Sequence, residues 1–317
     1  MKRAIVSGAT GFIGTVFVKY LIQNNIEVLA LGRKNYSEIS AVRKEKLKGS
    51  IYLKIDMSEI STLKNKISEI NFNPAESCVF VNLAWGGKSK LSDLDIDAQL
   101  KNVPWSVNAL EIAKTIGCEK FIQIGTMEEA FTYKYLDLDY RRNSEYNRHV
   151  IYSIAKIAAK KALEIKSRQL GIDFIYVLHS HVMAPDDDKD SFLQVTLQKL
   201  INRDELVFST GEQLFDVVSA KDCAKGYFLI CKKGIPGSEY WVGSGKPKKL
   251  REYVEKMYEL YPSGKKMQFG KLPYNDIKLT EEDFSIANLV KDTGYFPTSN
   301  YENIVRELYE SLLENEF

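Results

Sequence analysis

The most constraining feature of the sequence is a glycine-rich turn close to its start. Residues 4–14 read AIVSGATGFIG, so a short apolar run passes through Gly8, Gly11 and Gly14 into a second apolar segment. Glycines in such a turn let the backbone approach a pyrophosphate closely, and the helix that follows begins with unpaired N–H groups that favour an anion. The pattern predicts a strand, a phosphate-binding turn and a helix, which are typical of a dinucleotide-binding βαβ unit.

The first half of the chain continues this alternation. Its apolar runs are continuous rather than confined to every second position, which is typical of strands covered on both faces. Strands that alternate with helices predict a doubly wound, parallel α/β sheet of the Rossmann kind. We expect strands at Ala4–Ser7, Glu27–Leu31, Ile51–Ile55, Cys78–Leu83, Lys120–Ile124 and Phe174–Leu178, and helices at Phe12–Asn24, Ser58–Ile70, Ala98–Thr115 and Tyr152–Leu170.

The second half is less regular and predicts a smaller, mixed α/β region that binds substrate. We assign residues 1–178, with 214–243 returning to the sheet, to the dinucleotide-binding domain, and residues 179–213 and 244–317 to the substrate-binding region. Gly243–Lys249 contains two glycines and a proline, which is typical of a connection. Further elements are expected at Ser191–Asn202, Asp216–Ser219, Lys221–Cys231, Tyr240–Val242, Leu250–Leu260 and Glu302–Leu313.

Composition and charge narrow the possible partners. The net charge is only +2, which gives no argument for nucleic acid or an acidic membrane surface. No signal peptide and no apolar stretch of roughly 18 residues is visible, so we expect a cytoplasmic protein without a membrane span. The four cysteines form no CxxC pair, and the three histidines form no HxxxH motif. The run Asp186–Asp188 is typical of a solvated loop, so we expect no metal.

A tyrosine and a lysine stand four residues apart in the helix expected at 152–170. This spacing places Tyr152 and Lys156 on one helix face. A free phenol has a pKa of about 10, and a nearby ammonium lowers that pKa toward the neutral range. Thr126 follows the strand Lys120–Ile124, at the sheet edge where ligands of such folds bind. Each of the three has a plain structural alternative, and their common placement favours a catalytic site.

These motifs together carry a resemblance. The glycine turn, Thr126 and the Tyr152–Lys156 pair occur in the order found in the extended short-chain dehydrogenase/reductase family, also called the NAD-dependent epimerase/dehydratase family, which the whole chain resembles. The resemblance implies that Tyr152, Lys156 and Thr126 are catalytic. It also implies a homodimer formed through the helices at 98–115 and 152–170. Within the family, the pattern is most similar to nucleotide-sugar 4-ketoreductases of the CDP-paratose synthase kind.

The residues after the second strand bear on the cofactor. NAD-selecting enzymes usually carry an acid there, whereas this chain has Arg33 and Lys34. An arginine pairs with a ribose 2′-phosphate through two N–H donors, so we expect NADP rather than NAD, with a solvated loop cation as the alternative. Asp56 either contacts adenine or caps a helix, and Asn102 is either structural or an ordinary surface residue. The resemblance implies cofactor contacts from Gly8, Thr10, Gly11, Phe12, Ile13, Gly14, Arg33, Lys34, Asp56, Met57, Leu83, Ala84, Tyr152, Lys156, His179 and His181.

The expected substrate is a nucleotide-linked sugar. Dehydratases of the family carry an Asp-Glu pair after the threonine, whereas Met127 cannot donate a proton, which argues against dehydration. Two arginines that bind nucleotide phosphates in relatives are replaced by Phe215 and Tyr274. The resemblance implies substrate contacts from Trp85, Met127, Glu128, His181 and Phe215.

The expected reaction is therefore NADPH-dependent reduction of a 4-keto sugar. Two alternatives stay open: a redox-neutral epimerase, and a non-catalytic NADP sensor. The aromatic-rich stretch Phe131–Tyr146 is expected to be a loop that borders the substrate or is simply solvated.

Overall fold

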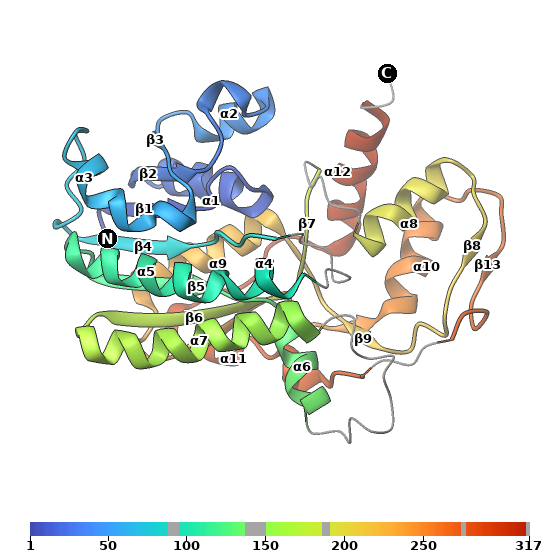
Figure 1. Ribbon diagram of the computed structural model, residues 1–317. Helices are drawn as coiled ribbons and strands as arrows, with labels where there is room; N and C mark the ends of the chain where they lie inside the picture. The colour runs from blue at the N-terminus through green and yellow to red at the C-terminus, as the bar shows by residue number, and fades with distance from the viewer. Residues whose placement is uncertain (88–94, 137–149, 186–190, 274–276, 315–317) are drawn as a thin grey trace.

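The computed structural model describes residues 1–87, 95–136, 150–185, 191–273 and 277–314. Its centre is a parallel sheet of seven strands in the order β11-β6-β5-β4-β1-β2-β3 (Figure 1). The strands are β1 Arg3–Ser7, β2 Glu27–Gly32, β3 Ile51–Lys54, β4 Cys78–Asn82, β5 Lys120–Ile124, β6 Asp173–His179 and β11 Glu239–Val242. The strand order reverses between β1 and β4, where open α/β sheets bind ligands. The predicted fold class is confirmed.

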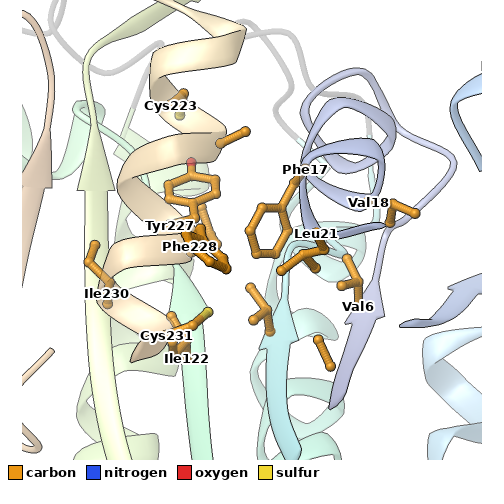
Figure 2. Packing of buried hydrophobic residues seen from close by; sticks show 14 of the residues in the cluster. Val6, Phe17, Val18, Leu21, Ile122, Cys223, Tyr227, Phe228, Ile230 and Cys231 are labelled. Atoms are coloured by element: carbon orange, nitrogen blue, oxygen red, sulfur yellow. The ribbon is translucent and has the colours of Figure 1, made fainter. Parts of the chain in front are cut away.

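Helices cover both faces of this sheet. One face carries α1 (Phe12–Gln23) and α9 (Ala220–Lys233), and the other carries α5 (Asn102–Thr115) and α7 (Val150–Leu170) (Figure 1). Figure 2 shows Phe17 of α1 facing Tyr227 of α9 near Val6 of β1, and the two rings pack edge to face with centroids 5.7 Å apart. The neighbouring Ile5 belongs to the buried cluster of the opposite face. This two-sided burial explains the continuous apolar runs.

A third buried cluster lies outside the sheet, in the part of the chain assigned to substrate binding. It includes Leu197 of α8, Val254 of α10 and Val305 of α12, all nearly inaccessible to solvent. The elements here are α8 Phe192–Ile201, α10 Leu250–Leu260, α12 Tyr301–Glu314, and the pairs β7 His181–Met183 with β10 Val217–Ser219, β9 Leu214–Phe215 with β12 Lys248–Lys249, and β8 Leu206–Val207 with β13 Met267–Gln268. No helix among the described residues is long and apolar enough to cross a membrane.

One buried carboxylate fastens the two passages between the sheet and this third cluster. Asp216 accepts hydrogen bonds from the hydroxyl of Ser180, just after β6, and from both the backbone N–H and the hydroxyl of Ser244, just after β11. The indole N–H of Trp241 donates to the Ser180 hydroxyl oxygen over 2.7 Å. Burial raises the pKa of Asp216, and these hydrogen bonds oppose that rise. The ends of β6 and β11 are therefore tied to one point.

Two expected helices and one expected loop differ from the prediction. The segment at 58–70 is a 3₁₀ helix, Met57–Thr62, followed by the short α3, Leu63–Ile67. The segment at 98–115 is interrupted at Lys101, between α4 (Ile96–Leu100) and α5, because Pro104 lacks the N–H that would donate to the carbonyl of Leu100. Part of the expected loop at 131–146 is helical, as α6 covers Glu128–Leu136. The structure adds α2 Ala41–Leu47 and α11 Ala287–Thr293.

Candidate active site

The glycine turn has the close backbone approach that its sequence predicts. Gly8 adopts a φ of +68°, and a Cβ there would lie 2.8 Å from the backbone nitrogen of Ala84. A Cβ on Gly14 would lie 2.2 Å from the carbonyl oxygen of Gly8, which also accepts the N–H of Gly11 over 3.0 Å. No side chain caps the start of α1 at Gly11. The turn therefore fits the pyrophosphate of a dinucleotide, which needs bare backbone and open N–H groups.

The residues after β2 and β3 form the side of the site assigned to the adenosine. Arg33 and Lys34 are both exposed. The carboxylate of Asp56 accepts the backbone N–H of Ser58 over 2.9 Å and its hydroxyl over 2.8 Å, so Asp56 caps the 3₁₀ helix. These hydrogen bonds, together with the charge of Arg33, lower the pKa of Asp56. The capping interpretation is confirmed, while the adenine contact stays a prediction.

Of the other residues expected at the cofactor, Thr10, Phe12 and Ile13 lie on the glycine turn and at the start of α1, and Met57 begins the 3₁₀ helix after β3. The carbonyl oxygen of Thr10 accepts a guanidinium N–H of Arg43 over 3.2 Å. Phe12 is buried, whereas Ile13 and Met57 are half-buried.

The end of β4 is held by buried polar side chains. Asn82 bonds to the hydroxyl of Ser7 on β1 and donates to the amide oxygen of Gln123 on β5 over 2.7 Å. The N–H groups of Leu83 and Ala84 both donate to Ser7, over 3.3 Å each. These bonds fix the segment that leads from β4 toward Trp85.

Asn102 holds the continuation of that segment. It accepts the N–H of Gly86 over 2.5 Å and donates to the carbonyl of Gly86 over 3.1 Å. Its side chain is buried. Asn102 is therefore a structural residue, and the surface alternative is wrong.

The predicted catalytic residues converge at the carboxyl ends of β4 and β5. The ring of Trp85 meets that of Tyr152 edge on, with centroids 6.1 Å apart. The ammonium of Lys156 lies 3.9 Å from the centroid of the Trp85 ring, close enough for a cation–π interaction, and donates to the carbonyl of Ile124 over 3.0 Å. Thr126, two residues further along the chain, lies close enough to the Tyr152 side chain to act on its hydroxyl. Four of the predicted site residues thus form one cluster.

The protonation of Tyr152 differs from the expectation. Burial raises the pKa of its hydroxyl well above 10, the hydrogen bond with Thr126 lowers it, and the negative charges of Glu129 and Glu128 raise it further. The ammonium of Lys156 lies over Trp85 and is 5.9 Å from the centroid of the Tyr152 ring. The expected lowering of the Tyr152 pKa by Lys156 is therefore wrong for this arrangement. A phenol in this setting is a proton donor at neutral pH.

Sequence reasoning missed two buried charged residues behind the tyrosine. Burial raises the pKa of Glu129 to about 7, against the opposing effects of Lys156 and of hydrogen bonds from Tyr176 and Thr126. Lys160 is buried and forms an ion pair with Glu239. A signal was available for Lys160, since it continues the four-residue spacing of Tyr152 and Lys156. For Glu129 the signal was an acid three residues after Thr126.

The residues after Thr126 do not form the expected loop. Met127 and Glu128 are half-buried at the start of α6. The hydroxyl of Thr132 is hydrogen-bonded to that of Ser153, and Lys134 forms an ion pair with Asp283, so α6 is fastened to α7 and to the C-terminal part of the chain. The remainder of the predicted loop, together with Asp186–Asp188 and Tyr274, lies outside the described residues.

His181 of β7 and Phe215 of β9 form a second group of predicted residues, and His179 lies at the end of β6. The ring centroids of His181 and Phe215 are 5.3 Å apart, and those of Phe215 and Tyr253 are 6.3 Å apart. The Nδ1 of His179 is 2.9 Å from the carbonyl oxygen of Ser180. The cofactor and substrate contacts assigned to these residues stay predictions. Within the described ranges, no group of three acidic, histidine or cysteine side chains is arranged to hold a metal.

Comparisons with known proteins agree with this geometry. The chain is 24% identical to CDP-abequose synthase of Salmonella typhimurium, over 98% of each chain. It is 24% identical to a probable dTDP-glucose 4,6-dehydratase of Sinorhizobium fredii, over 99% of this chain and 93% of the relative. The structure of UDP-glucose 4-epimerase from Thermotoga maritima with UDP-glucose superposes with a TM-score of 0.77 at 18% identity, over 99% of this chain and 100% of that one. The model of the NAD dependent epimerase/dehydratase family matches residues 4–243, and the chain belongs to that family.

Proposed function

We propose that this chain is an NADPH-dependent reductase of a 4-keto sugar carried on a nucleotide. The observation that supports it best is the cluster at the carboxyl ends of β4 and β5, where Tyr152 and Lys156 lie beside Trp85 and Thr126. A protonated phenol suits the reduction of a ketone, because the carbonyl oxygen must gain a proton as its carbon gains a hydride. Membership of the epimerase/dehydratase family supports the nucleotide-sugar substrate class.

Each residue of the cluster has a role in this reaction. The nicotinamide, when bound, supplies the hydride that reaches the carbonyl carbon. Tyr152 donates its hydroxyl proton to the carbonyl oxygen, while the Thr126 hydroxyl donates a hydrogen bond to the same oxygen and stabilises its developing charge. Lys156, held by Ile124 and Trp85, orients the cofactor ribose. The phenolate that remains on Tyr152 is reprotonated from solvent, so protons balance.

The residue after Thr126 separates reduction from dehydration. Elimination of water needs a proton donor beside the threonine, and Met127 has none. The full-length similarity to a protein named CDP-abequose synthase supports a cytidine nucleotide, although the residue at position 215 is Phe. Phosphates would then be held by lysines or backbone N–H groups.

The proposal is tested by mixing the enzyme, NADPH and a panel of CDP-, dTDP- and UDP-linked 4-keto sugars. We expect at least one sugar to oxidise NADPH in a one-to-one ratio with the alcohol formed, followed by absorbance and product analysis. No consumption of NADPH across the panel would contradict the proposal.

We also propose NADP as the cofactor, on the basis of Arg33. Arg33→Asp should weaken NADPH binding by about 10- to 100-fold, because a charge-assisted hydrogen bond is worth about 1.5–3 kcal/mol and an acid would repel the 2′-phosphate. NADH binding should be unchanged or tighter. Lys19→Asp, the same charge change on the exposed face of α1, is the matched control. Equal affinity of the Arg33 variant and the parent for NADPH would contradict the assignment.

A redox-neutral epimerase is the second candidate, supported by the likeness to UDP-glucose 4-epimerase over the whole chain. The same residues would take a hydride from the sugar and return it to the other face. Inversion at the sugar carbon while the bound cofactor stays unchanged over many turnovers would favour this candidate. A non-catalytic sensor is disfavoured by the retention of Thr126, Tyr152 and Lys156. An unchanged biological output of Tyr152→Phe would revive it.

The domain division and the homodimer also remain proposals. Helices α5 and α7 lie side by side on one face of the sheet (Figure 1), and α7 exposes Ile154 and Ile165. Such a face suits a second copy of the chain. Sedimentation that finds only the 36.2 kDa monomer at micromolar concentration would contradict the homodimer.

A further inference from the structure

An acid that the proposed reaction does not use lies directly behind the active site. Glu129 is in the first turn of α6, and its side chain is fully buried. Its Oε1 accepts the backbone N–H of Thr126 and the hydroxyl of Tyr176, each over 2.9 Å. Its Oε2 has no hydrogen-bond partner among the described residues. A buried carboxyl with an unsatisfied oxygen is costly, so a function is needed to explain it.

The backbone makes room for this carboxyl. A Cβ on Gly125 would lie 2.5 Å from Oε1 of Glu129 and 2.6 Å from Cε1 of Tyr176. Only glycine at position 125 therefore admits both side chains. The N–H of Gly125 donates to the carbonyl of Val177 over 2.7 Å, which holds this point against β6. The carboxyl is thus built into the end of β5, immediately behind Thr126.

Charged and titratable side chains face Glu129 from each element packed around it. They are Tyr152, Lys156 and Lys160 on α7 and Tyr176 on β6, while Glu128 on α6 acts on Tyr152 and Glu239 on β11 acts on Lys160 and Tyr176. The charge of Lys160 is compensated by its ion pair with Glu239. The remaining cation is Lys156, whose charge favours the ionised form of Glu129, while that form acts on Tyr152. Glu129, Lys156 and Tyr152 therefore form one electrostatic unit.

We propose that Glu129 is a positioning residue whose carboxylate holds the backbone of Thr126 in place and disfavours the phenolate form of Tyr152. The proposal rests on the reductase function. A negative charge beside a phenol disfavours the phenolate, and the phenolate is the form that would catalyse oxidation of an alcohol. Glu129 itself makes and breaks no bond with the substrate. Since its pKa is raised to about 7, its charge changes within the neutral pH range.

Glu129→Gln tests this directly, because Gln keeps the oxygen that accepts from Thr126 and Tyr176 but cannot carry the charge. Tyrosinate absorbance is titrated in the parent and in Glu129→Gln, and the titration of the matching Tyr152→Phe protein is subtracted from each. We expect the Tyr152 signal to titrate at least about one pH unit lower without the charge, a tenfold change in the phenolate ratio. Glu164→Gln is the control, since Glu164 lies on α7 and is paired with Lys161; this variant should leave the titration of Tyr152 unchanged. Coincident titrations in the parent and Glu129→Gln would overturn the proposal.

The parent protein provides a second measurement if the variant does not fold. In protein labelled with ¹³C at glutamate carboxyls, one signal should titrate near pH 7, and a protein whose glutamates all titrate near the ordinary value of about 4.3 would overturn the proposal. Neither titration uses a sugar. If the Tyr152 titration shifts in Glu129→Gln but the protein reduces no 4-keto sugar, the proposed reductase function is rejected and the role of Glu129 stands. If the protein reduces a 4-keto sugar but the Tyr152 titration does not shift, the reductase function stands and the role of Glu129 is rejected.

Discussion

Tyr152→Phe should lower kcat for NADPH-dependent reduction by about 10²- to 10⁴-fold, the range that a positioned general acid contributes. The phenyl ring keeps the edge contact with Trp85, so the change removes the proton and little packing. NADPH affinity should change by less than the rate does. Stopped-flow absorbance of NADPH with saturating 4-keto sugar measures the rate, and fluorescence titration measures the affinity.

The control for this variant is Tyr309→Phe, which also removes one phenolic hydroxyl but lies on α12, stacked on Tyr261. It should reduce the sugar at the parental rate. A parental rate in Tyr152→Phe itself would mean that another group supplies the proton. In that case the only buried acid beside the cluster, within the described residues, is Glu129.

Gly14→Ala should have the second largest effect, a loss of NADPH affinity of about 100-fold. A single added methyl would lie 2.2 Å from the carbonyl oxygen of Gly8 and 3.0 Å from the Cα of Ala9, so α1 must move away from the turn. Overpacking of this kind costs about 1–3 kcal/mol of unfolding free energy. It also displaces the N–H groups that would face the phosphates. Fluorescence titration and urea unfolding measure the two losses separately.

Val16→Ala is the matched control on the same helix. It removes apolar volume from a half-buried site without touching the turn, so it should lower stability while leaving NADPH affinity close to that of the parent. Parental affinity in Gly14→Ala would contradict the assignment of this turn as the phosphate cradle.

Local signals predicted the sheet well, because its strands contain adjacent apolar residues, which are typical of a sheet covered on both faces. Neighbouring residues such as Ile5 and Val6 belong to opposite cores, and both are fully buried. The helix predicted at residues 98–115 is wrong at one point, Lys101, because the prediction did not allow for the N–H that Pro104 lacks. Several strands of two or three residues, such as β9, were missed because so short a run shows no periodicity.

The site was predictable where its chemistry is local and not where it depends on distant partners. The spacing of Tyr152 and Lys156 follows from the helix, and the structure brings both to Thr126. The position of the Lys156 ammonium depends on Trp85, which is 71 residues away along the chain, and no local pattern in the sequence indicates that contact. The pairing of Glu129 with Tyr176 spans 47 residues in the same way.

The hydrogen bonds that Asp216 accepts from Ser180 and Ser244 affect how a substrate binds. Both passages out of the sheet end on the same buried carboxylate, through Ser180 and Ser244. Bending the molecule at this joint would strip hydrogen bonds from a buried charge, each worth about 1.5–3 kcal/mol. The connection between the sheet and the third cluster is therefore rigid and does not act as a hinge. The carboxyl edge of the sheet and the region of the third cluster therefore keep a fixed spacing before the sugar binds. Binding then loses little free energy to a rearrangement of the protein.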